Sequence, residues 1–479
     1  MSKLNEMTIV EAAQALRARE ITVRELWDAC AEVAKAKNPE LNAFLEIFDA
    51  DETAIASAQK RIDGNDESLL CGIPLATKDN ILIEGKIASA GSKMLANYQA
   101  TYDATVIKKL RDAGALFLGR TNMDEFALGS STENSAFGVT KNPHDISRVA
   151  GGTSGGSAAA VAANMAIAAL GTDTGGSVRN PASYCGVVAI KPTYGGVSRS
   201  GVIAAASSFD QVGPIAKTVE DARILFNTIR GRDDKDSTTI PDGLYARKQK
   251  EIKTIGVPTH LFTDALDKDV YELFQSTLKK LGFKVKEIEI HSAKPALAAY
   301  YIINFAEVST NLARYDGVRY GHAARGETLL DDYILSRTEG FGREARRRIL
   351  LGTYVLSSGY IDAYYYKANA ARAALRRAFE KAFESVDVIA TPTMPTPAFK
   401  IGEKSDPLSM YLEDIFTVTA NLTGMPALSV PMGAVERPST SLGATGNVRL
   451  PVGIHFTAPH QAEGVLFAAG IAGENAQKA

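Results

Sequence analysis

The chain of 479 residues is 45% apolar and 23% charged, as expected for a globular protein that can bury a large core. Lys and Arg total 53 against 55 Asp and Glu, and this balance argues against a chain-wide electrostatic grip on nucleic acid or anionic lipid. Three distant cysteines and six scattered histidines give neither a disulfide framework nor zinc-ligand spacing, so we expect no metal site. No apolar run could span a bilayer and no signal peptide is evident, which predicts a soluble, cytoplasmic protein.

The first elements predicted along the chain are two capped helices. Thr8 with Glu11 and Thr22 with Glu25 both fit the capping-box pattern ahead of amphipathic runs. Asn38, which precedes a proline, is the predicted end of the second helix.

Short apolar strands then alternate with helices. The predicted strands are residues 72–77, 115–119, 186–190, 255–258, 283–290, 386–390 and 427–430. The main predicted helices are 103–113, 157–169, 218–229, 267–281, 296–314 and a long one over 343–383, broken near 357–359. This alternation predicts an α/β fold with a large mixed central β-sheet covered by helices on both faces. We expect one domain over 1–479, with N-terminal helices in 1–65, core motifs in 71–214 and the rest of the sheet in 215–479.

Two glycine-rich segments, Gly151–Ser157 and Gly171–Ser177, are the most unusual feature of the sequence. Closely spaced glycines cost backbone entropy, and they suit places where the chain turns sharply or its N–H groups approach a ligand. Neither segment has the lysine of a phosphate-binding loop or the pattern of a dinucleotide-binding turn. Flexible turns that only join strands to helices are the plainer interpretation.

Lys78 stands at the end of a predicted buried strand, Gly72 to Thr77. A single lysine is usually a solvated surface charge. At the mouth of a buried strand it can lose its hydration, which lowers its pKa and makes the neutral amine a usable base. Because serine is a poor nucleophile without a base and no histidine lies near these motifs, a Ser–Lys arrangement is predicted.

Together these three segments resemble the motifs of the amidase signature family. The resemblance to that family extends over nearly the whole chain. The resemblance implies a Ser–cis-Ser–Lys triad in which Lys78 is the base and Ser177 is the nucleophile that forms an acyl-enzyme. The bridging position falls on Thr153, where the family usually has serine, and the neighbouring Ser154 is the alternative. The added methyl group of threonine restricts its side-chain rotamer. The resemblance also implies a cis peptide bond at the bridging residue.

The same resemblance implies an oxyanion hole, formed by the backbone N–H groups of Thr174, Gly175, Gly176 and Ser177. Small residues let several amides converge on one oxygen, and such donors typically supply a few kcal/mol to the transition state. The flanking Asp173 and Arg179 are expected to form a structural ion pair that holds this loop.

Residues 306–321, 340–353 and 411–417 extend the likeness beyond the shared motifs. They resemble the A subunits of glutamyl-tRNA(Gln) amidotransferases, the glutamine-hydrolysing subunits of glutaminyl-tRNA synthase. That resemblance implies hydrolysis of glutamine and delivery of ammonia to a partner that amidates Glu-tRNA(Gln), and often Asp-tRNA(Asn). It implies a heterotrimer with B and C subunits and tRNA contact mainly through the B subunit. It also implies no cofactor in this chain, since ATP and Mg²⁺ are expected on the partner.

A glutamine site needs groups for a carboxylate and an ammonium. The resemblance implies that Arg347 binds the substrate carboxylate. Because Arg346 and Arg348 stand on either side of it, the alignment is ambiguous by one residue. The resemblance places Asp414 on the ammonium, with Tyr300 or Tyr301 also near the substrate. A solvated helix face is the plainer interpretation of the three arginines.

Two other functions remain open from the sequence. One is a stand-alone amidase acting on small amides with the same triad. The other is a nucleotide-binding scaffold, which the missing phosphate-loop lysine disfavours. The segment Pro451–Thr457 departs from the resemblance, and its His455 is predicted to be packed rather than catalytic.

Overall fold

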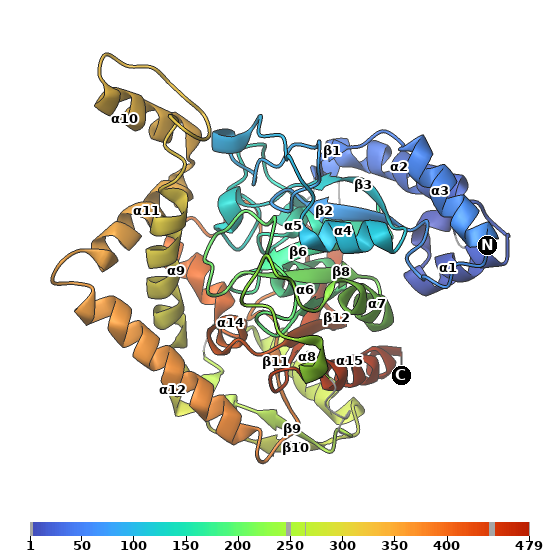
Figure 1. Ribbon diagram of the computed structural model, residues 1–479. Coiled ribbons are helices and arrows are strands. Elements are labelled where there is room, and N and C mark those ends of the chain that lie inside the picture. The colour runs from blue at the N-terminus through green and yellow to red at the C-terminus, as the bar shows by residue number, and fades with distance from the viewer. Residues whose placement is uncertain (1–2, 246–250, 264, 440–445, 479) are drawn as a thin grey trace.

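The computed structural model describes residues 3–245, 251–263, 265–439 and 446–478. Its strands are β1 (Phe44–Ile47), β2 (Pro74–Lys78), β3 (Leu116–Thr121), β4 (Lys141–Asn142), β5 (Asp145–Val149), β6 (Ala168–Asp173), β7 (Val188–Lys191), β8 (Gln211–Ala216), β9 (Thr254–Val257), β10 (Lys284–Glu287), β11 (Val388–Pro392), β12 (Ala427–Pro438) and β13 (Asn447–Thr457). Eleven of them form one sheet in the order β1-β3-β2-β6-β8-β7-β12-β13-β11-β9-β10 (Figure 1). β2 pairs in parallel with both β3 and β6, whereas β6–β8 and β12–β13 are antiparallel, so the sheet is mixed as predicted.

Helices cover both faces of this sheet. They include α4 (Thr105–Asp112), α5 (Gly155–Ala162), α6 (Arg179–Cys185), α7 (Val219–Ile229), α8 (Lys268–Lys280) and α15 (Glu463–Lys478). On β12, the side chain of Leu428 lies against Gly470 of α15, while the next residue, Ser429, lies beside Gly453 and Ser183 of α6. Because successive strand residues point to opposite faces, α15 and α6 lie on opposite sides of the sheet.

The N-terminal helices are α1 (Ile9–Arg17), α2 (Val23–Leu41) and α3 (Glu52–Asp63), and both predicted capping boxes are confirmed. The predicted end of α2 at Asn38 is wrong. The helix continues to Leu41 with Pro39 inside its last turn, and the Asn42 amide still donates to Asn38 O at 2.8 Å. Proline is tolerated there because Asn42 enters the left-handed region at once and ends the helix.

The predicted helix over 157–169 is also wrong in its second half. α5 ends at Ala162, Asn164 adopts a positive φ of 56°, and the chain turns into β6. Both halves are rich in alanine, so local propensity does not separate them. Pairing of β6 with β2 on one side and β8 on the other decides the outcome, because only a strand can satisfy both neighbours.

A second group of helices stands beside the sheet. It comprises α9 (Ala296–Leu312), α10 (Leu329–Gly340), α11 (Arg343–Leu356), a π-helical turn η7 (Asp362–Tyr366), α12 (Lys367–Ala382), α13 (Pro407–Tyr411), the 3₁₀ turn η8 (Leu412–Asp414) and α14 (Val418–Thr423). The predicted break near 357–359 separates α11 from η7 and is confirmed. Figure 1 shows α9, α11 and α12 along one side of the molecule, with α10 projecting from it.

Gly352 lets α11 approach α9 closely. A Cβ at this position would lie 1.9 Å from Phe305 O on α9, so no larger residue fits without separating the two helices. The contact matters because α9 and α11 both contribute side chains to the site described below. Within the described ranges, no helix combines the length and apolar character that crossing a bilayer requires.

Candidate active site

Strand ends at one edge of the sheet bring the predicted catalytic residues together. Lys78 is the last residue of β2, and its parallel neighbour β6 ends at Asp173, directly before the loop that carries Ser177. Thr153 and Ser154 precede α5, which packs against β2 and β6. Neighbouring parallel strands end at the same edge, so three segments distant in sequence meet there.

Lys78 is fully buried among hydroxyl groups. Its Nζ lies 2.7 Å from Thr153 Oγ1, 2.8 Å from Ser154 Oγ and 2.9 Å from Thr172 Oγ1. Among the described residues no carboxylate lies within ion-pair distance of it. Burial lowers the pKa of Lys78 to about 7, because desolvation disfavours the ammonium and the surrounding acids offset this only in part. A substantial fraction of neutral amine, the form that can accept a proton, is therefore present near pH 7.

The hydrogen bonds separate the two candidates for the bridging role. Ser154 Oγ donates to Thr172 O at 3.1 Å, accepts from the Thr172 amide at 3.3 Å, and also contacts Lys78. A hydroxyl has one donor and two acceptor sites, so that of Ser154 is fully occupied. Thr153 Oγ1 contacts Lys78 alone among the described residues and keeps capacity for a second partner. This geometry favours Thr153 as the group that can pass a proton.

Ser177 lies next to this cluster, and its side of the loop opens to a small pocket. The residue is 7% exposed, and its carbonyl accepts from the Ser154 amide at 3.1 Å. The structure records no hydrogen bond from the Ser177 hydroxyl to Thr153, although catalytic contacts are often longer in enzymes without substrate. The cis peptide implied at Thr153 is not found: no peptide bond of the described residues is cis, in keeping with the cost of this form before a residue other than proline.

Asp173 organises the loop that was predicted to form the oxyanion hole. Its Oδ1 accepts from the Gly176 amide at 3.0 Å and its Oδ2 from the Val178 amide at 3.2 Å. The Gly176 amide is therefore already committed and does not fit the predicted role. The amides of Gly175 and Ser177, for which the described residues supply no acceptor, keep that capacity. Gly175 packs tightly beneath Tyr300, since a Cβ there would lie 2.3 Å from the phenol oxygen.

The expected ion pair between Asp173 and Arg179 is confirmed, at 2.9 Å with both side chains fully buried. Although burial acts in the opposite direction, Arg179 holds the pKa of Asp173 below its ordinary value. Arg179 Nη1 lies 2.8 Å from Nε2 of His455, and burial keeps the pKa of His455 well below its usual range. His455 is thus neutral and accepts at Nε2, as a packed residue of β13 behind the loop. The divergent segment 451–457 therefore belongs to the scaffold of the site.

A cavity of about 10 Å³ lies over Ser177, room for roughly one water molecule. The polar side chains around it are Ser130, Ser177, Asn180, Tyr300, Arg348 and Asp414. Of the four residues predicted to bind substrate, Tyr300 and Asp414 line this cavity, and Tyr301 contacts Asp414. A substrate larger than water requires some of the lining side chains to move.

Asp414 is the buried acid of this pocket. Tyr301 donates to its Oδ2 at 2.6 Å and Ser130 to the same oxygen at 2.9 Å. Burial raises the pKa of Asp414 to about 7, with the two hydroxyl donors and Arg348 acting against it. A carboxylate in this setting gains from a cationic partner, because the added positive charge would restore its ionised form.

The structure places Arg348, and not Arg347, in the pocket. Arg347 is partly exposed and pairs with Glu344, whereas Arg348 is buried and reaches the pocket. Arg348 Nε donates to Glu344 at 2.8 Å and its Nη1 to Asn304 at 3.0 Å, which leaves three of its five N–H groups for another partner. One residue rotates a helix position by 100°, enough to move a side chain from the inner to the outer face.

Three residues of the site escaped the sequence analysis: Ser130, Thr172 and Glu344. Thr172 lies inside a glycine-rich segment that was singled out, so its hydroxyl could have been considered. Glu344 stands four residues before Arg348, a helical ion-pair spacing that the sequence does display. Ser130 had no comparable signal.

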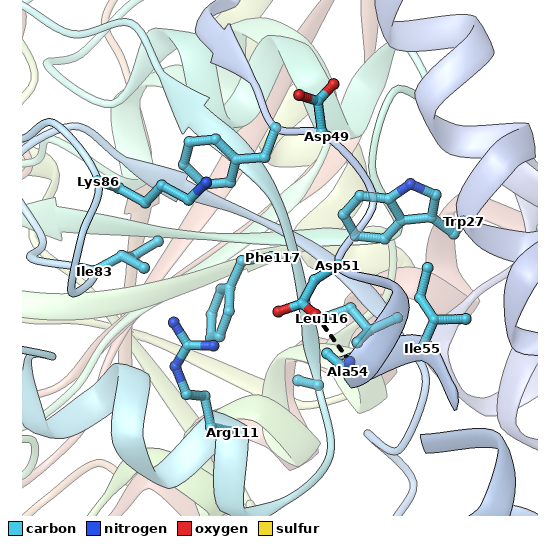
Figure 2. A pocket seen from close by; sticks show the side chains of 12 residues that line it. Trp27, Asp49, Asp51, Ala54, Ile55, Ile83, Lys86, Arg111, Leu116 and Phe117 are labelled. Atoms are coloured by element: carbon cyan, nitrogen blue, oxygen red, sulfur yellow. Dashed lines mark hydrogen bonds between the residues drawn. The ribbon is translucent and has the colours of Figure 1, made fainter. Parts of the chain in front are cut away.

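A second cavity of about 80 Å³ lies near the N-terminal helices (Figure 2). Trp27, Phe117 and other apolar side chains line it, and Asp51 beside it caps α3 by accepting from the Ala54 amide at 3.0 Å. None of the predicted catalytic or substrate-binding residues borders this cavity. This cavity therefore plays no part in the predicted site.

Comparison with known proteins agrees with this geometry. A relative from Thermoanaerobacter pseudethanolicus, named as the A subunit of glutamyl-tRNA(Gln) amidotransferase, is 48% identical over 487 aligned positions, covering 99% of this chain and 97% of the relative. A protein of the same name from Thermodesulfovibrio yellowstonii is 51% identical over 85% of this chain and 84% of its own length. The crystal structure of the protein of that name from Thermotoga maritima has a TM-score of 0.77 at 40% identity, covering 98% of this chain and 94% of that one.

The fold is shared more widely than this name. The structure of the peptide amidase PAM bound to the inhibitor chymostatin has a TM-score of 0.80 at 30% identity, covering 99% of this chain and 98% of that one. A sequence model of the amidase family matches residues 25–467. The chain therefore belongs to the amidase family.

Proposed function

We propose that this chain is the glutamine-hydrolysing A subunit of a glutamyl-tRNA(Gln) amidotransferase. The observation that carries the proposal is the buried contact between Lys78 and Thr153 beside Ser177, in a pocket that also holds a carboxylate and a guanidinium. The lysine and the hydroxyl groups suit amide hydrolysis. The carboxylate and the guanidinium suit the charged α-ammonium and α-carboxylate of a free amino acid. The names of relatives that are about half identical over most of the chain support the same activity.

Acylation begins with proton transfer out of Ser177. Neutral Lys78 accepts the hydroxyl proton of Thr153, which takes the proton of Ser177 as the serine oxygen bonds to the side-chain amide carbon of glutamine. The carbonyl oxygen becomes an anion that the loop amides, including those of Gly175 and Ser177, can stabilise. When the C–N bond breaks, Lys78 returns the proton through Thr153, and ammonia leaves a glutamyl ester on Ser177.

Deacylation repeats these steps with water. Water loses a proton to Lys78 through Thr153 and attacks the ester carbon. The ester bond to Ser177 then breaks, its oxygen regains a proton, and glutamate is released. Lys78 ends each half-reaction neutral, so one base serves both.

Glutamine is recognised through its charged α-substituents. The remaining N–H groups of Arg348 suit the α-carboxylate, since a guanidinium can hold a carboxylate through two parallel hydrogen bonds. Asp414 suits the α-ammonium, whose charge lowers the pKa of the acid as it binds. A peptide or simple amide lacks one or both charges, so this pair favours the free amino acid.

Ammonia released here serves a partner. We propose assembly with B and C subunits into a heterotrimer, in which the B subunit holds the tRNA and, with ATP and Mg²⁺, activates its glutamyl or aspartyl ester. This chain then contributes only hydrolysis and supply of ammonia.

The nucleophile is tested by Ser177→Ala, compared with Ser131→Ala. Ser131 is a buried neighbouring serine whose hydroxyl has no hydrogen-bond partner in the described structure. Ser177→Ala should lower glutaminase kcat at least about a thousandfold, since no nucleophile remains, whereas Ser131→Ala should stay within about threefold. The complex carrying Ser177→Ala should still amidate Glu-tRNA when ammonium salt is supplied. Equal losses in both variants would contradict the assignment.

The base is tested by the pH dependence of Ser177 labelling with a fluorophosphonate. With the pKa of Lys78 lowered to about 7, the reactive neutral amine is lost as pH falls below that value, so labelling should rise with pH and reach half its maximum near pH 7. The probe has no ammonium, so its binding does not require ionised Asp414. Lys78→Arg stays protonated and should label as slowly as Lys78→Ala. A profile that is flat from pH 5.5 to 8.5, or rescue by arginine, would argue against Lys78 as the base.

The bridging role is tested by exchanging hydroxyls. Thr153→Ser should retain activity, whereas Thr153→Val, which keeps the shape without the proton path, should lose at least about a hundredfold in kcat. Ser154→Ala should lose less than about tenfold, although it leaves Thr172 groups unpaired and should lower stability by about 1–3 kcal/mol. Rates are therefore compared per folded protein, measured by thermal unfolding. An inactive Ser154→Ala beside an active Thr153→Val would move the bridge to Ser154.

The substrate carboxylate contact is tested by two lysine substitutions that keep the charge. Arg348→Lys should raise KM for glutamine about tenfold or more, equivalent to about 1.4 kcal/mol, because lysine cannot reproduce the planar fork. Arg347→Lys should change KM by less than about twofold, because this residue lies on the outer face. Steady-state glutaminase kinetics measure KM for both variants. A larger rise in KM for Arg347→Lys than for Arg348→Lys would assign the carboxylate contact to Arg347.

A further inference from the structure

An exposed cluster of tyrosines and leucines runs from the second half of α11 to η7. It consists of Leu350, Leu351, Tyr354, Tyr360, Tyr364 and Tyr366, called here the Tyr–Leu surface. Leu350 is 71% exposed and Tyr354 is 46% exposed, although large apolar side chains are normally covered. The six side chains come from a stretch of 17 residues, 350–366, so they are not scattered singly.

Three of the tyrosines, Tyr354, Tyr360 and Tyr364, contact one another. The ring centroids of Tyr354 and Tyr360 are 4.4 Å apart, and those of Tyr360 and Tyr364 are 6.2 Å apart. Aromatic side chains held against each other lose little further freedom when a partner covers them, which is why tyrosines are enriched in protein interfaces. The π-helical turn η7 that carries Tyr364 and Tyr366 is itself a rare geometry found often at functional positions.

Charge identifies the chemistry of the partner. On the exposed side of α11, Arg343 and Arg346 flank the leucines, and Arg347 is held by Glu344. Across residues 357–366 the sequence has one charged residue, Asp362. The α11 end of the surface therefore carries exposed positive charge beside the apolar side chains, and it fits a protein surface that is apolar in the middle and acidic at the edge that meets α11.

The position of α11 links this surface to the pocket. The inner face of the helix carries Arg348 into the site, and two residues later the outer face presents Leu350. Figure 1 shows α11 and the start of α12 along one side of the molecule, with α15 on another. A protein that docks on the outer face of α11 is one helix diameter from the pocket that releases ammonia.

We propose that the Tyr–Leu surface is where this chain binds the ammonia-accepting subunit of its amidotransferase, through an apolar patch with an acidic rim on that partner. This rests on the proposed function for the identity of the partner. The surface itself follows from exposure, clustering and charge.

Binding of the chain to purified B and C subunits tests the proposal. Leu350→Glu and Tyr354→Ala should each weaken the dissociation constant, measured by calorimetry, at least tenfold. Tyr102→Ala is the matched control, since Tyr102 is 48% exposed and lies outside the surface, and it should bind within twofold of the unsubstituted chain. Fluorophosphonate labelling of Ser177 in the isolated Leu350→Glu chain should be unchanged, which shows that the fold and site are intact.

Other results overturn the proposal. They are unaltered binding by Leu350→Glu and Tyr354→Ala, an equal loss with Tyr102→Ala, or no binding of the unsubstituted chain to the B and C subunits. A concentration-dependent dimer of the chain alone that Leu350→Glu abolishes, seen by light scattering, would assign the surface to a second copy instead. Binding uses no glutamine, so a complex that forms normally yet shows no glutaminase contradicts the proposed function and leaves the surface standing.

Discussion

Burial of Lys78 without a carboxylate partner is the constraint on which the site depends. A lysine exposed at a strand end would be protonated and useless as a base at neutral pH, and one paired with an acid would be more firmly protonated still. The sheet supplies the burial, because β2 lies inside it between β3 and β6. Thr153, Ser154 and Thr172 then supply neutral contacts, which satisfy the amine without fixing its charge. The architecture thus sets the pKa, and the hydroxyls set the direction in which a proton can move.

The loop that carries Ser177 depends on a second buried arrangement. Asp173 binds two amides of the loop and is itself held by Arg179, which also contacts Asn421 and His455. Removing one member would leave a buried charge uncompensated, a change that typically costs about 3–5 kcal/mol. Because disrupting this charged network is costly, the loop keeps one conformation although it contains Gly175 and Gly176. The network, rather than the intrinsic preference of the glycines, sets the shape of the loop. It also explains why β13, far from Ser177 in sequence, belongs to the site.

Sequence reasoning singled out Lys78, Thr153 and Ser177 because each stands in a motif whose spacing carries chemical meaning, and the structure brings these segments together. It failed where two interpretations have the same local chemistry. The alanine-rich stretch after Ser157 suits both a helix and a buried strand, and only pairing with β2 and β8 separates α5 from β6. Arg347 and Arg348 are identical side chains on one helix, and only the packing of α11 on α9, through Gly352, decides which faces inward. Commitment of the Gly176 amide to Asp173 likewise depends on the loop conformation, which the sequence does not reveal.

The pocket over Ser177 is smaller than the proposed substrate. Glutamine does not fit a cavity of about 10 Å³, so side chains must move before it binds. Lys78 and Ser177 stand at or next to the ends of central strands, where shifts would break ladder hydrogen bonds and the Asp173 network. Tyr300, Arg348 and Asp414 come from α9, α11 and η8, which are not part of the sheet. The part of the pocket that is built from helices therefore shares α11 with the Tyr–Leu surface: Arg348 faces the pocket, and Leu350 faces solvent.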